Sequence, residues 1–285
     1  MIPLFNVTDE SLDVAKTAKY RLSVRSAEDS FSYCILDSSR NKYIAIRVYN
    51  FGKLDGFLSA GERWKEIVEN EKLLQLSFQS INIALVNQAS TLVPSAIYDE
   101  NRKNTFLHFN QTELQDEIVF SDTIRLAESR NVFSFPKLMA ESLFKLFPGA
   151  SVHHYSTSLI SSLLGQFKNS PDKNLIVHIQ PFSFEAILVE GGNLLFYNSF
   201  RYHAPEDFMY FLMFCCDRLK LNPEKIAISL VGEIEKNSTL YALLFKYFRN
   251  VKFGERPDSF QYSYGFSEFP AHFFYNLFSQ PLCES

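Results

Sequence analysis

Apolar runs of strand length, separated by Gly, Pro and Asn, follow one another between residues 174 and 254. Pro181 and Gly191-Gly192 stand between the first three runs, which is typical of a tight antiparallel meander. Pro205 then opens a helical pattern, because proline is favoured in the first turn of a helix. The predicted elements are strands over 175–180, 184–190 and 193–201, a helix over 205–221, a strand over 226–231, a helix over 238–248 and a strand over 251–253.

The first half of the chain repeats this order of elements. Its predicted elements are strands over 20–26, 30–37 and 42–51, a helix over 59–76 and a strand over 80–86. Ser59 is expected to cap that helix, with Glu62 three residues later. The pairs Ser30-Phe31 and Ser183-Phe184 each begin the return strand of a first hairpin. We therefore predict a degenerate internal repeat of one β-β-β-α-β unit, with chance likeness between short hairpins as the alternative.

The repeat divides the chain into two α/β domains. Residues 87–131 are polar and irregular, so we expect them to form an insertion in the first domain, followed by an edge strand over 131–135. The predicted divisions are an entry segment over 1–19 that is poorly fixed, a first domain over 20–155, a crossing helix and linker over 156–173, and a second domain over 174–285 with an aromatic C-terminal helix.

Composition narrows the classes of function. With 46% hydrophobic residues among 285, the chain can bury a large core. A net charge of −4 without a Lys/Arg block disfavours a nucleic-acid partner. No apolar run approaches the ~20 residues of a membrane span, and the N-terminus lacks a signal-peptide pattern. Four cysteines without framework spacing fit reduced thiols, so we expect a cytoplasmic protein without direct membrane insertion.

Two pairs of neighbouring reactive residues, one of histidines and one of cysteines, do not indicate a metal site or a catalytic site. His153 and His154 would point to opposite faces of a strand, so they cannot grip one metal ion together. Cys215 and Cys216 lie in an apolar helical pattern, where cysteine acts as a small hydrophobic residue. The sequence therefore predicts neither a metal site nor a catalytic residue.

The duplicated β-β-β-α-β-α-β order resembles the actin/Hsp70/sugar-kinase superfold. That resemblance implies the actin-like ATPase fold, in which two duplicated ribonuclease-H-like domains enclose an interdomain cleft. The chain is similar to PilM-type pilus-assembly ATPase-like proteins and to an uncharacterised family of Bacteroidetes, a domain of unknown function. The resemblance covers the chain from about Tyr20 onwards.

In the second half, the resemblance implies a phosphate hairpin with the pattern Asp-x-Gly-x-x-Thr. The Asp orients Mg²⁺, the Gly lets backbone amides approach the phosphates, and the hydroxyl donates to them. This sequence has His178 at the Asp position and Gln180 at the Gly position, and only the hydroxyl is kept, as Ser183. Pro181 also removes a backbone N–H. We expect the phosphate chemistry of this hairpin to be degraded.

The other two nucleotide elements are kept in part. The first hairpin has the hydroxyls of Ser26 and Ser30 but no glycine, and Glu28 and Asp29 would repel a triphosphate unless Mg²⁺ intervened. The adenosine-binding turn, usually Gly-Gly, keeps one glycine in the run 232–234 that follows a strand. A glycine at a strand-to-helix turn is also an ordinary structural choice.

Two hypotheses follow from this partial loss. The first is a non-catalytic scaffold, a pseudo-ATPase without cofactor, that binds a protein partner or itself. The second is an ATPase that binds ATP with magnesium through atypical loops. The aromatic stretch 260–282 either docks on the sheet of the second domain or forms an exposed patch for a partner. If nucleotide binds, the residues that would contact it are Ser26, Asp29, Ser30, Gln180, Ser183, Gly232 and Glu233.

Overall fold

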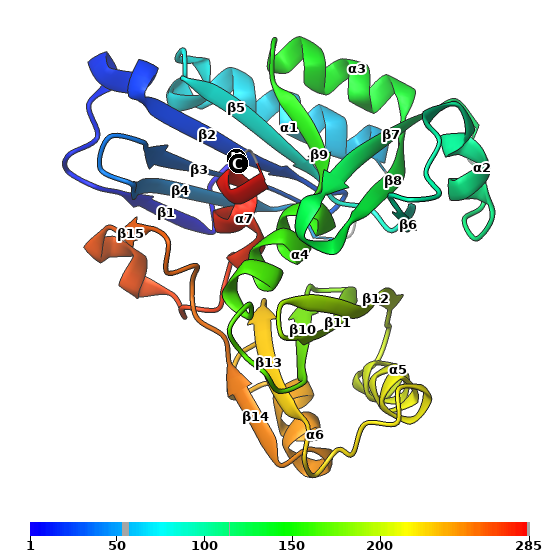
Figure 1. The fold of residues 1–285 in the computed structure, drawn as a ribbon. Coiled ribbons are helices and arrows are strands. Elements are labelled where there is room, and N and C mark those ends of the chain that lie inside the picture. The colour runs from blue at the N-terminus through cyan, green and yellow to red at the C-terminus, as the bar shows by residue number, and fades with distance from the viewer. Residues whose placement is uncertain (53–56, 114, 284–285) are drawn as a thin grey trace. The chain divides into compact units, whose positions relative to one another are not determined.

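The computed structural model describes residues 1–52, 57–113 and 115–283. Within these ranges the strands form three sheets, and the chain divides into two compact units (Figure 1). Unit 1 comprises Met1–Leu159, Ser259–Glu268 and Leu277–Ser285, and unit 2 comprises Ile160–Asp258 and Phe269–Asn276.

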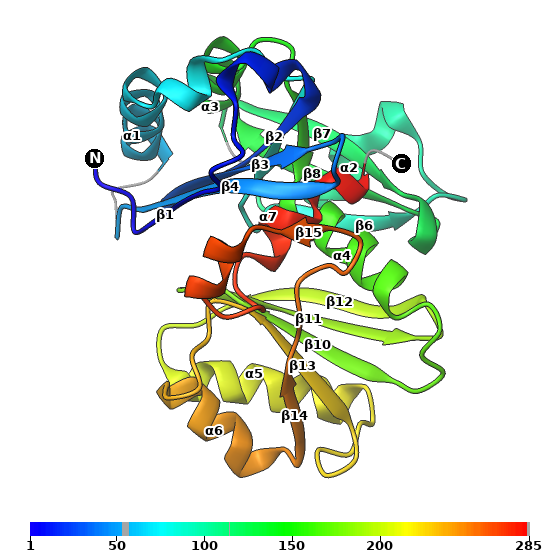
Figure 2. The same cartoon turned by 90° about the vertical axis from the view of Figure 1, so that its left-hand side faces the viewer.

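The main sheet of unit 1 has the strand order β1-β4-β3-β2-β5-β9 (Figure 1), with β15 beside β4 (Figure 2). Strands β2, β3 and β4 are antiparallel, whereas β5 and β9 continue the sheet in parallel. The helices α1 and α3 pack on it through a core that contains Trp64 and Met139. The bounds are β1 (Phe5–Thr8), β2 (Tyr20–Ser26), β3 (Ser30–Asp37), β4 (Lys42–Asn50), α1 (Phe57–Asn70), β5 (Ser80–Leu85), α3 (Lys137–Leu146), β9 (Ser151–His154) and β15 (Gln261–Tyr262).

Unit 2 repeats this plan in a sheet of order β12-β11-β10-β13-β14. Its antiparallel strands come first and two parallel strands follow, as in unit 1. The helices α5 and α6 bury Phe208, Leu212 and Leu244 against the sheet. The bounds are β10 (Asn174–Ile179), β11 (Ser183–Glu190), β12 (Asn193–Arg201), α5 (Pro205–Arg218), β13 (Ala227–Gly232), α6 (Thr239–Tyr247) and β14 (Asn250–Phe253). The helices α4 (Tyr155–Gln166) and α7 (Tyr275–Ser279) each include residues assigned to both units.

The predicted repeat is confirmed down to the register of the strands. Phe31 pairs with Ser26 across the first hairpin, and Phe184 pairs with Ile179 across the second. The register of the second and third strands also shifts at matching positions, between Ile35 and Leu36 in unit 1 and between Leu188 and Val189 in unit 2. Chance likeness would not reproduce a bulge at the same place.

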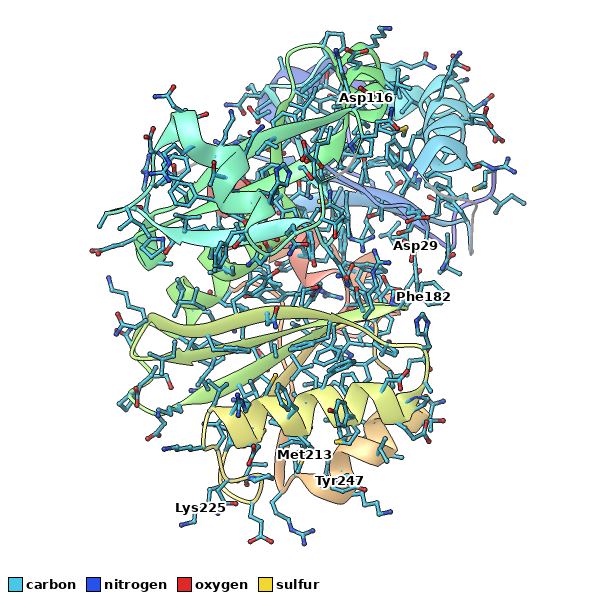
Figure 3. All side chains as sticks on the ribbon, turned by 90° about the vertical axis from the view of Figure 1, so that its right-hand side faces the viewer. Asp29, Asp116, Phe182, Met213, Lys225 and Tyr247 are labelled. Atoms are coloured by element: carbon cyan, nitrogen blue, oxygen red, sulfur yellow. The ribbon has the colours of Figure 1, made fainter. Side chains whose placement is uncertain are left out.

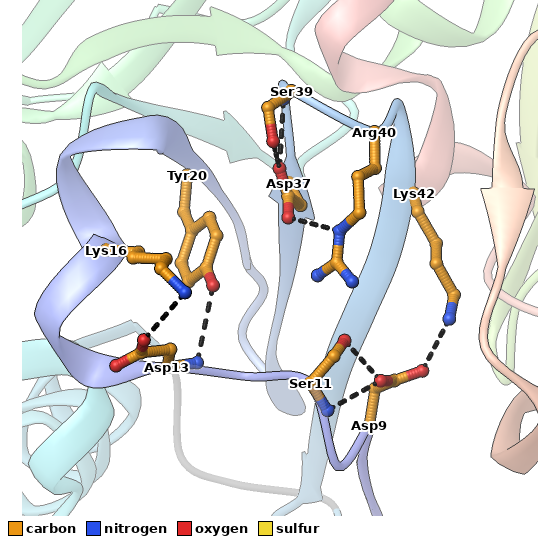
Figure 4. Close-up of polar contacts among 9 residues, drawn as sticks. All are labelled: Asp9, Ser11, Asp13, Lys16, Tyr20, Asp37, Ser39, Arg40 and Lys42. Carbon is orange, nitrogen blue, oxygen red and sulfur yellow. Dashed lines mark hydrogen bonds and ion pairs between the residues drawn. The ribbon is translucent and has the colours of Figure 1, made fainter.

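The N-terminal residues are built into unit 1, which corrects the expectation of a poorly fixed segment over 1–19. Strand β1 pairs with β4 at the edge of the sheet. The Asp9 carboxylate accepts hydrogen bonds from Lys42, at 2.7 Å, and from the backbone of Ser11, at 2.8 Å (Figure 4). The backbone N–H of Asp13 donates to the Tyr20 hydroxyl at 3.3 Å. Order here comes from pairing with distant residues, which a local pattern does not reveal.

The insertion over 87–131 has its own sheet and helix in the part that the structure describes, which leaves out residue 114. The strand order is β6-β8-β7, so the edge strand predicted over 131–135 is wrong, because β8 lies in the centre. Buried Val93, Leu107 and Val132 give the insertion a small core. The bounds are β6 (Ser90–Pro94), α2 (Lys103–His108), β7 (Glu117–Ile124) and β8 (Ser129–Pro136).

The prediction that Ser59 caps the first helix is wrong. Ser59 lies inside α1 rather than at its N-cap, because the helix already includes Phe57.

The aromatic C-terminal segment was assigned to the second domain, but it does not belong to one unit, because Ser259–Glu268 and Leu277–Ser285 cluster with unit 1. The C-terminal helix α7 is short and covers five residues. Among the described residues, no helix has the length and apolar character needed to cross a membrane.

Candidate functional site

The first hairpin, between β2 and β3, holds Ser26, Asp29 and Ser30. The Arg25 guanidinium donates to Ser30 Oγ at 2.9 Å, and that hydroxyl donates to Asp29 Oδ1 at 2.9 Å. Ser26 ends β2 and is fully buried, and its Oγ has no hydrogen-bond partner among the described residues. The hydroxyl proton of Ser30 is therefore directed at a carboxylate of its own hairpin rather than outward.

The second hairpin, between β10 and β11, holds Gln180 and Ser183. The backbone N–H of Gln180 donates to the Ser183 carbonyl at 2.9 Å, and the Gln180 carbonyl accepts from the Tyr202 hydroxyl at 2.7 Å. Phe182 projects from the tip of this turn and is 54% exposed (Figure 3). Both backbone groups of Gln180 are thus engaged within the unit, and Pro181 supplies no N–H.

A buried polar network lies at the base of the second hairpin. His178 Nδ1 and Glu185 Oε2 are 2.5 Å apart, and Gln180 Nε2 donates to Glu185 Oε1 at 3.1 Å. All three side chains are buried, and the Glu185 side chain is fully buried. A buried carboxylate is stable only when such partners replace its water. Glu185 is the acid nearest in sequence to the degraded motif, and its oxygens are occupied by protein groups.

The register of the hairpins identifies a residue that sequence reasoning missed. Arg25 pairs with Ser32 one position before the first turn, and His178 pairs with Glu185 one position before the second. Arg25 therefore occupies in unit 1 the place that His178 occupies in unit 2. In both repeats a basic side chain stands where the resemblance implies the magnesium-orienting Asp. Extending the overlay of the two Ser-Phe pairs by a few residues would have found it.

The turn after β13 needs glycine for a structural reason. Gly232 has a φ of +93°, and a Cβ there would lie 2.2 Å from the Ile179 carbonyl oxygen. The same carbonyl accepts a hydrogen bond from the N–H of Glu233 at 2.7 Å. Close contact between β13 and β10 thus explains the glycine that the sequence offered as a nucleotide element.

The backbone N–H of Gly232 is also engaged. It donates to the His272 carbonyl at 2.8 Å. The His272 ring stacks on Phe253, with centroids 4.3 Å apart, and Phe253 stacks in turn on Tyr241 at 5.0 Å. Burial lowers the pKa of His272, although the Ile234 carbonyl bonded to Nε2 opposes the shift. A segment of the protein itself therefore covers the turn that resembles an adenosine-binding element.

Within each unit, the candidate residues lie at one end of the sheet. Ile179 pairs with Gly232 in adjacent parallel strands, so the second hairpin and the glycine turn lie at one end of the unit 2 sheet. The first hairpin occupies the corresponding end of its own sheet, next to β5. In the described ranges, His, Cys, Asp and Glu side chains form no group of three that could hold a metal ion.

Comparison with known proteins agrees with this architecture. The family described as "Protein of unknown function (DUF3822)" matches residues 9–251. No curated protein matches the sequence. A Bacteroides thetaiotaomicron structure described as having an actin-like ATPase fold and unknown function is 23% identical, with a TM-score of 0.76 over 85% of this chain and 93% of that one. A PilM–PilN type IV pilus biogenesis complex is 12% identical, with a TM-score of 0.63 over 92% of this chain and 97% of that one. These likenesses show the actin-like ATPase fold.

Proposed function

The chain belongs to this DUF3822 family, and we propose that it is a non-catalytic protein of the actin-like fold that acts by binding a protein partner. The observation that carries this proposal is the pair of basic residues at the two positions where an acid would orient Mg²⁺. Arg25 and His178 cannot supply that oxygen ligand, because Mg²⁺ is held by carboxylates, phosphates and water. Function resides in sites rather than in folds, so the fold can persist without the chemistry.

The hydrogen bonds of the loops support the same proposal. Glu185 is an acid on the neighbouring strand, but its carboxylate is bonded to His178 and Gln180. The N–H of Gly232 is bonded to His272. A nucleotide would have to displace these internal bonds before it gained its own, and each buried group left unpaired costs about 1–3 kcal/mol. The residues present do not fit magnesium with a triphosphate.

A protein partner is favoured by the relatives of the fold. PilM, which shares the fold, is described in a complex with PilN. We extend only that mode of action, binding to another protein, to this chain. The buried free thiols of Cys34, Cys215 and Cys216 fit a reducing compartment, so we propose the cytoplasm as its location.

The alternative function is an ATPase that binds Mg²⁺-ATP through atypical loops. It is favoured by the hydroxyl of Ser183, which is partly exposed at the second hairpin, and by the positive φ of Gly232. In that case Asp29 or Glu28 would place the magnesium ion at the first hairpin, where the Asp29 carboxylate accepts a hydrogen bond from the Ser30 hydroxyl.

Thermal unfolding with and without millimolar Mg²⁺-ATP or Mg²⁺-ADP separates the two functions. A ligand at 100 times its Kd stabilises the folded state by about 2.7 kcal/mol, which raises Tm by several degrees in a chain of this size. We expect Tm to stay within about 1 °C, because the donors of the loops are engaged internally. A shift of several degrees that Ser183→Ala removes, and that the exposed control Ser151→Ala keeps, would establish nucleotide binding instead.

A further inference from the structure

The outer face of α5 carries a ridge of four residues spaced four apart. Glu206, Tyr210, Phe214 and Arg218 are all exposed, and the two aromatic side chains are 66% and 47% exposed. The opposite face of the helix buries Phe208 and other residues in the core of unit 2. Figure 3 shows α5 along its length in yellow. Large aromatic side chains exposed in a row are uncommon on a surface that stays in contact with water.

The side chains of the ridge are already ordered against one another. The rings of Tyr210 and Phe214 stack with centroids 6.4 Å apart and an angle of 19° between planes. The Arg218 guanidinium lies over the Phe214 ring at 5.6 Å. Among the described residues, neither Glu206 nor Arg218 forms an ion pair. Little side-chain entropy would be lost if the aromatic rings packed against a partner, since they are held in place beforehand.

The order of residues along the ridge is complementary to itself. Glu206 and Arg218 lie equally far from position 212, and so do Tyr210 and Phe214. When two copies of a helix pack antiparallel about a two-fold axis at that position, each residue meets the one at the mirrored distance. Glu206 of each copy would then contact Arg218 of the other, and Tyr210 of each copy would contact Phe214 of the other. The two-fold axis thus forms each of these contacts two times.

We propose that α5 is the interface through which the protein binds a second copy of itself. Aromatic and arginine side chains at the centre of a contact supply most of its energy, and the opposite charges at its ends fix the antiparallel register. The ridge contains none of the residues of the hairpins or of the glycine turn. The inference therefore goes beyond the proposed function and stands whether or not nucleotide binds.

The edge strand of the unit 2 sheet packs against α5. Strand β12 ends this sheet, and the Phe200 ring of β12 stacks on Phe211 of α5 at 5.2 Å. The strand carries the charged residue Arg201 and a bulge at Leu195, and both features limit pairing of an edge with another strand. A second copy would therefore pack on the helix rather than extend the sheet.

Sedimentation velocity of the full-length protein over a range of concentrations tests the proposal through exchanged charges. We expect the wild type to dimerise, and Glu206→Arg or Arg218→Glu alone to weaken the dimer about tenfold, because each creates two like-charge contacts. An equimolar mixture of these two variants should form a mixed dimer, and the double variant should regain wild-type affinity. The control Glu62→Arg reverses an exposed charge on α1 and should change nothing.

The aromatic contribution is tested in the same experiment. Phe214→Gln should abolish the dimer, whereas Phe245→Gln, an exposed phenylalanine on α6 that is 51% exposed, should leave it intact. Thermal unfolding checks that each variant folds. A wild type that is monomeric at all concentrations, single charge variants without effect, or a mixture that fails to regain the dimer would each overturn the proposal. A different protein bound to α5 by a monomeric wild type would do so as well.

Discussion

Gly232 illustrates how a structural requirement can imitate a binding motif. Its positive φ and its approach to the Ile179 carbonyl demand glycine without any ligand. The sequence alone offered both explanations, because a turn from strand to helix uses the same residue in either case. Only the distance between β13 and β10 distinguishes them, and that distance depends on strand pairing.

This explanation predicts opposite effects of alanine at two glycines of unit 2. Gly232→Ala should destabilise the protein by about 3 kcal/mol or more, because it combines an unfavourable φ with a contact of 2.2 Å to backbone. Gly165→Ala should stabilise it by about 0.5–1 kcal/mol, since the residue lies in α4 and a Cβ there meets nothing within 4 Å. Urea unfolding measures both, and equal effects would contradict the structural role of Gly232.

The pair of His178 and Glu185 marks the limit of sequence reasoning at the candidate site. The degraded motif was visible in the sequence, since His178 stands at an expected acid position. The acid that bonds to His178 lies on the return strand, and its identity follows from register rather than from motif spacing. Of these three polar side chains only Gln180 was predicted to contact a nucleotide, whereas in the structure Gln180 and His178 both bond Glu185.

At the start of α4, backbone and side-chain donors are likewise hydrogen-bonded by another group of the protein. Asp122 Oδ2 accepts two hydrogen bonds of 2.7 Å, from the backbone N–H of His154 and from the Thr157 hydroxyl. The carboxylate from β7 thus caps the N-terminus of α4, where a negative charge is favourable. Burial nevertheless raises the pKa of Asp122 to about 7, because the hydrogen bonds from Thr157 and His154 offset the loss of water only in part. Burial likewise lowers the pKa of His154 to about 3.

Asp122 should make stability depend on pH between about 4 and 7. In that window the folded state keeps a proton that the unfolded state has released, so stability falls as pH rises. Asp122→Asn keeps one oxygen for both hydrogen bonds and does not titrate. The difference in unfolding free energy, variant minus wild type, should therefore increase by on the order of 3 kcal/mol from pH 4 to pH 7 and then level off. His154 titrates in both proteins, so its contribution cancels in this difference. If the difference in unfolding free energy does not change with pH, the raised pKa of Asp122 is contradicted.

Strands bounded by turn residues were predictable, and strands that depend on distant partners were not. The predicted bounds of β2 (Tyr20–Ser26) and β3 (Ser30–Asp37) agree with the structure to the residue. Strand β1 (Phe5–Thr8) was missed because four residues of mixed polarity gain order only by pairing with β4. Strand β8 (Ser129–Pro136) was placed at an edge because its partners lie in polar segments without a clear alternation.

The C-terminal segment connects the ends of the chain in a way that no local pattern predicts. Strand β15 pairs in parallel with β4, and Gln280 Nε2 donates to the Val24 carbonyl at 3.0 Å. The Tyr43 hydroxyl donates to the Phe278 carbonyl at 2.7 Å. Residues more than 200 positions apart thus share the core of unit 1. Removing residues 260–285 to test partner binding would therefore remove part of this core together with any exposed aromatic surface.

Two single substitutions separate these roles of the segment better than truncation does. Phe278→Ala should cost about 3–5 kcal/mol, because its ring is fully buried and lies 4.9 Å from Tyr43 and 5.3 Å from Tyr262. Tyr264→Ala should change stability by no more than about 0.5 kcal/mol, since that ring is 92% exposed. Urea unfolding gives both values. If Tyr264→Ala abolishes capture of a partner while leaving unfolding unchanged, the segment has a binding surface separate from its structural role. If Phe278→Ala leaves stability unchanged, the segment does not hold unit 1 together.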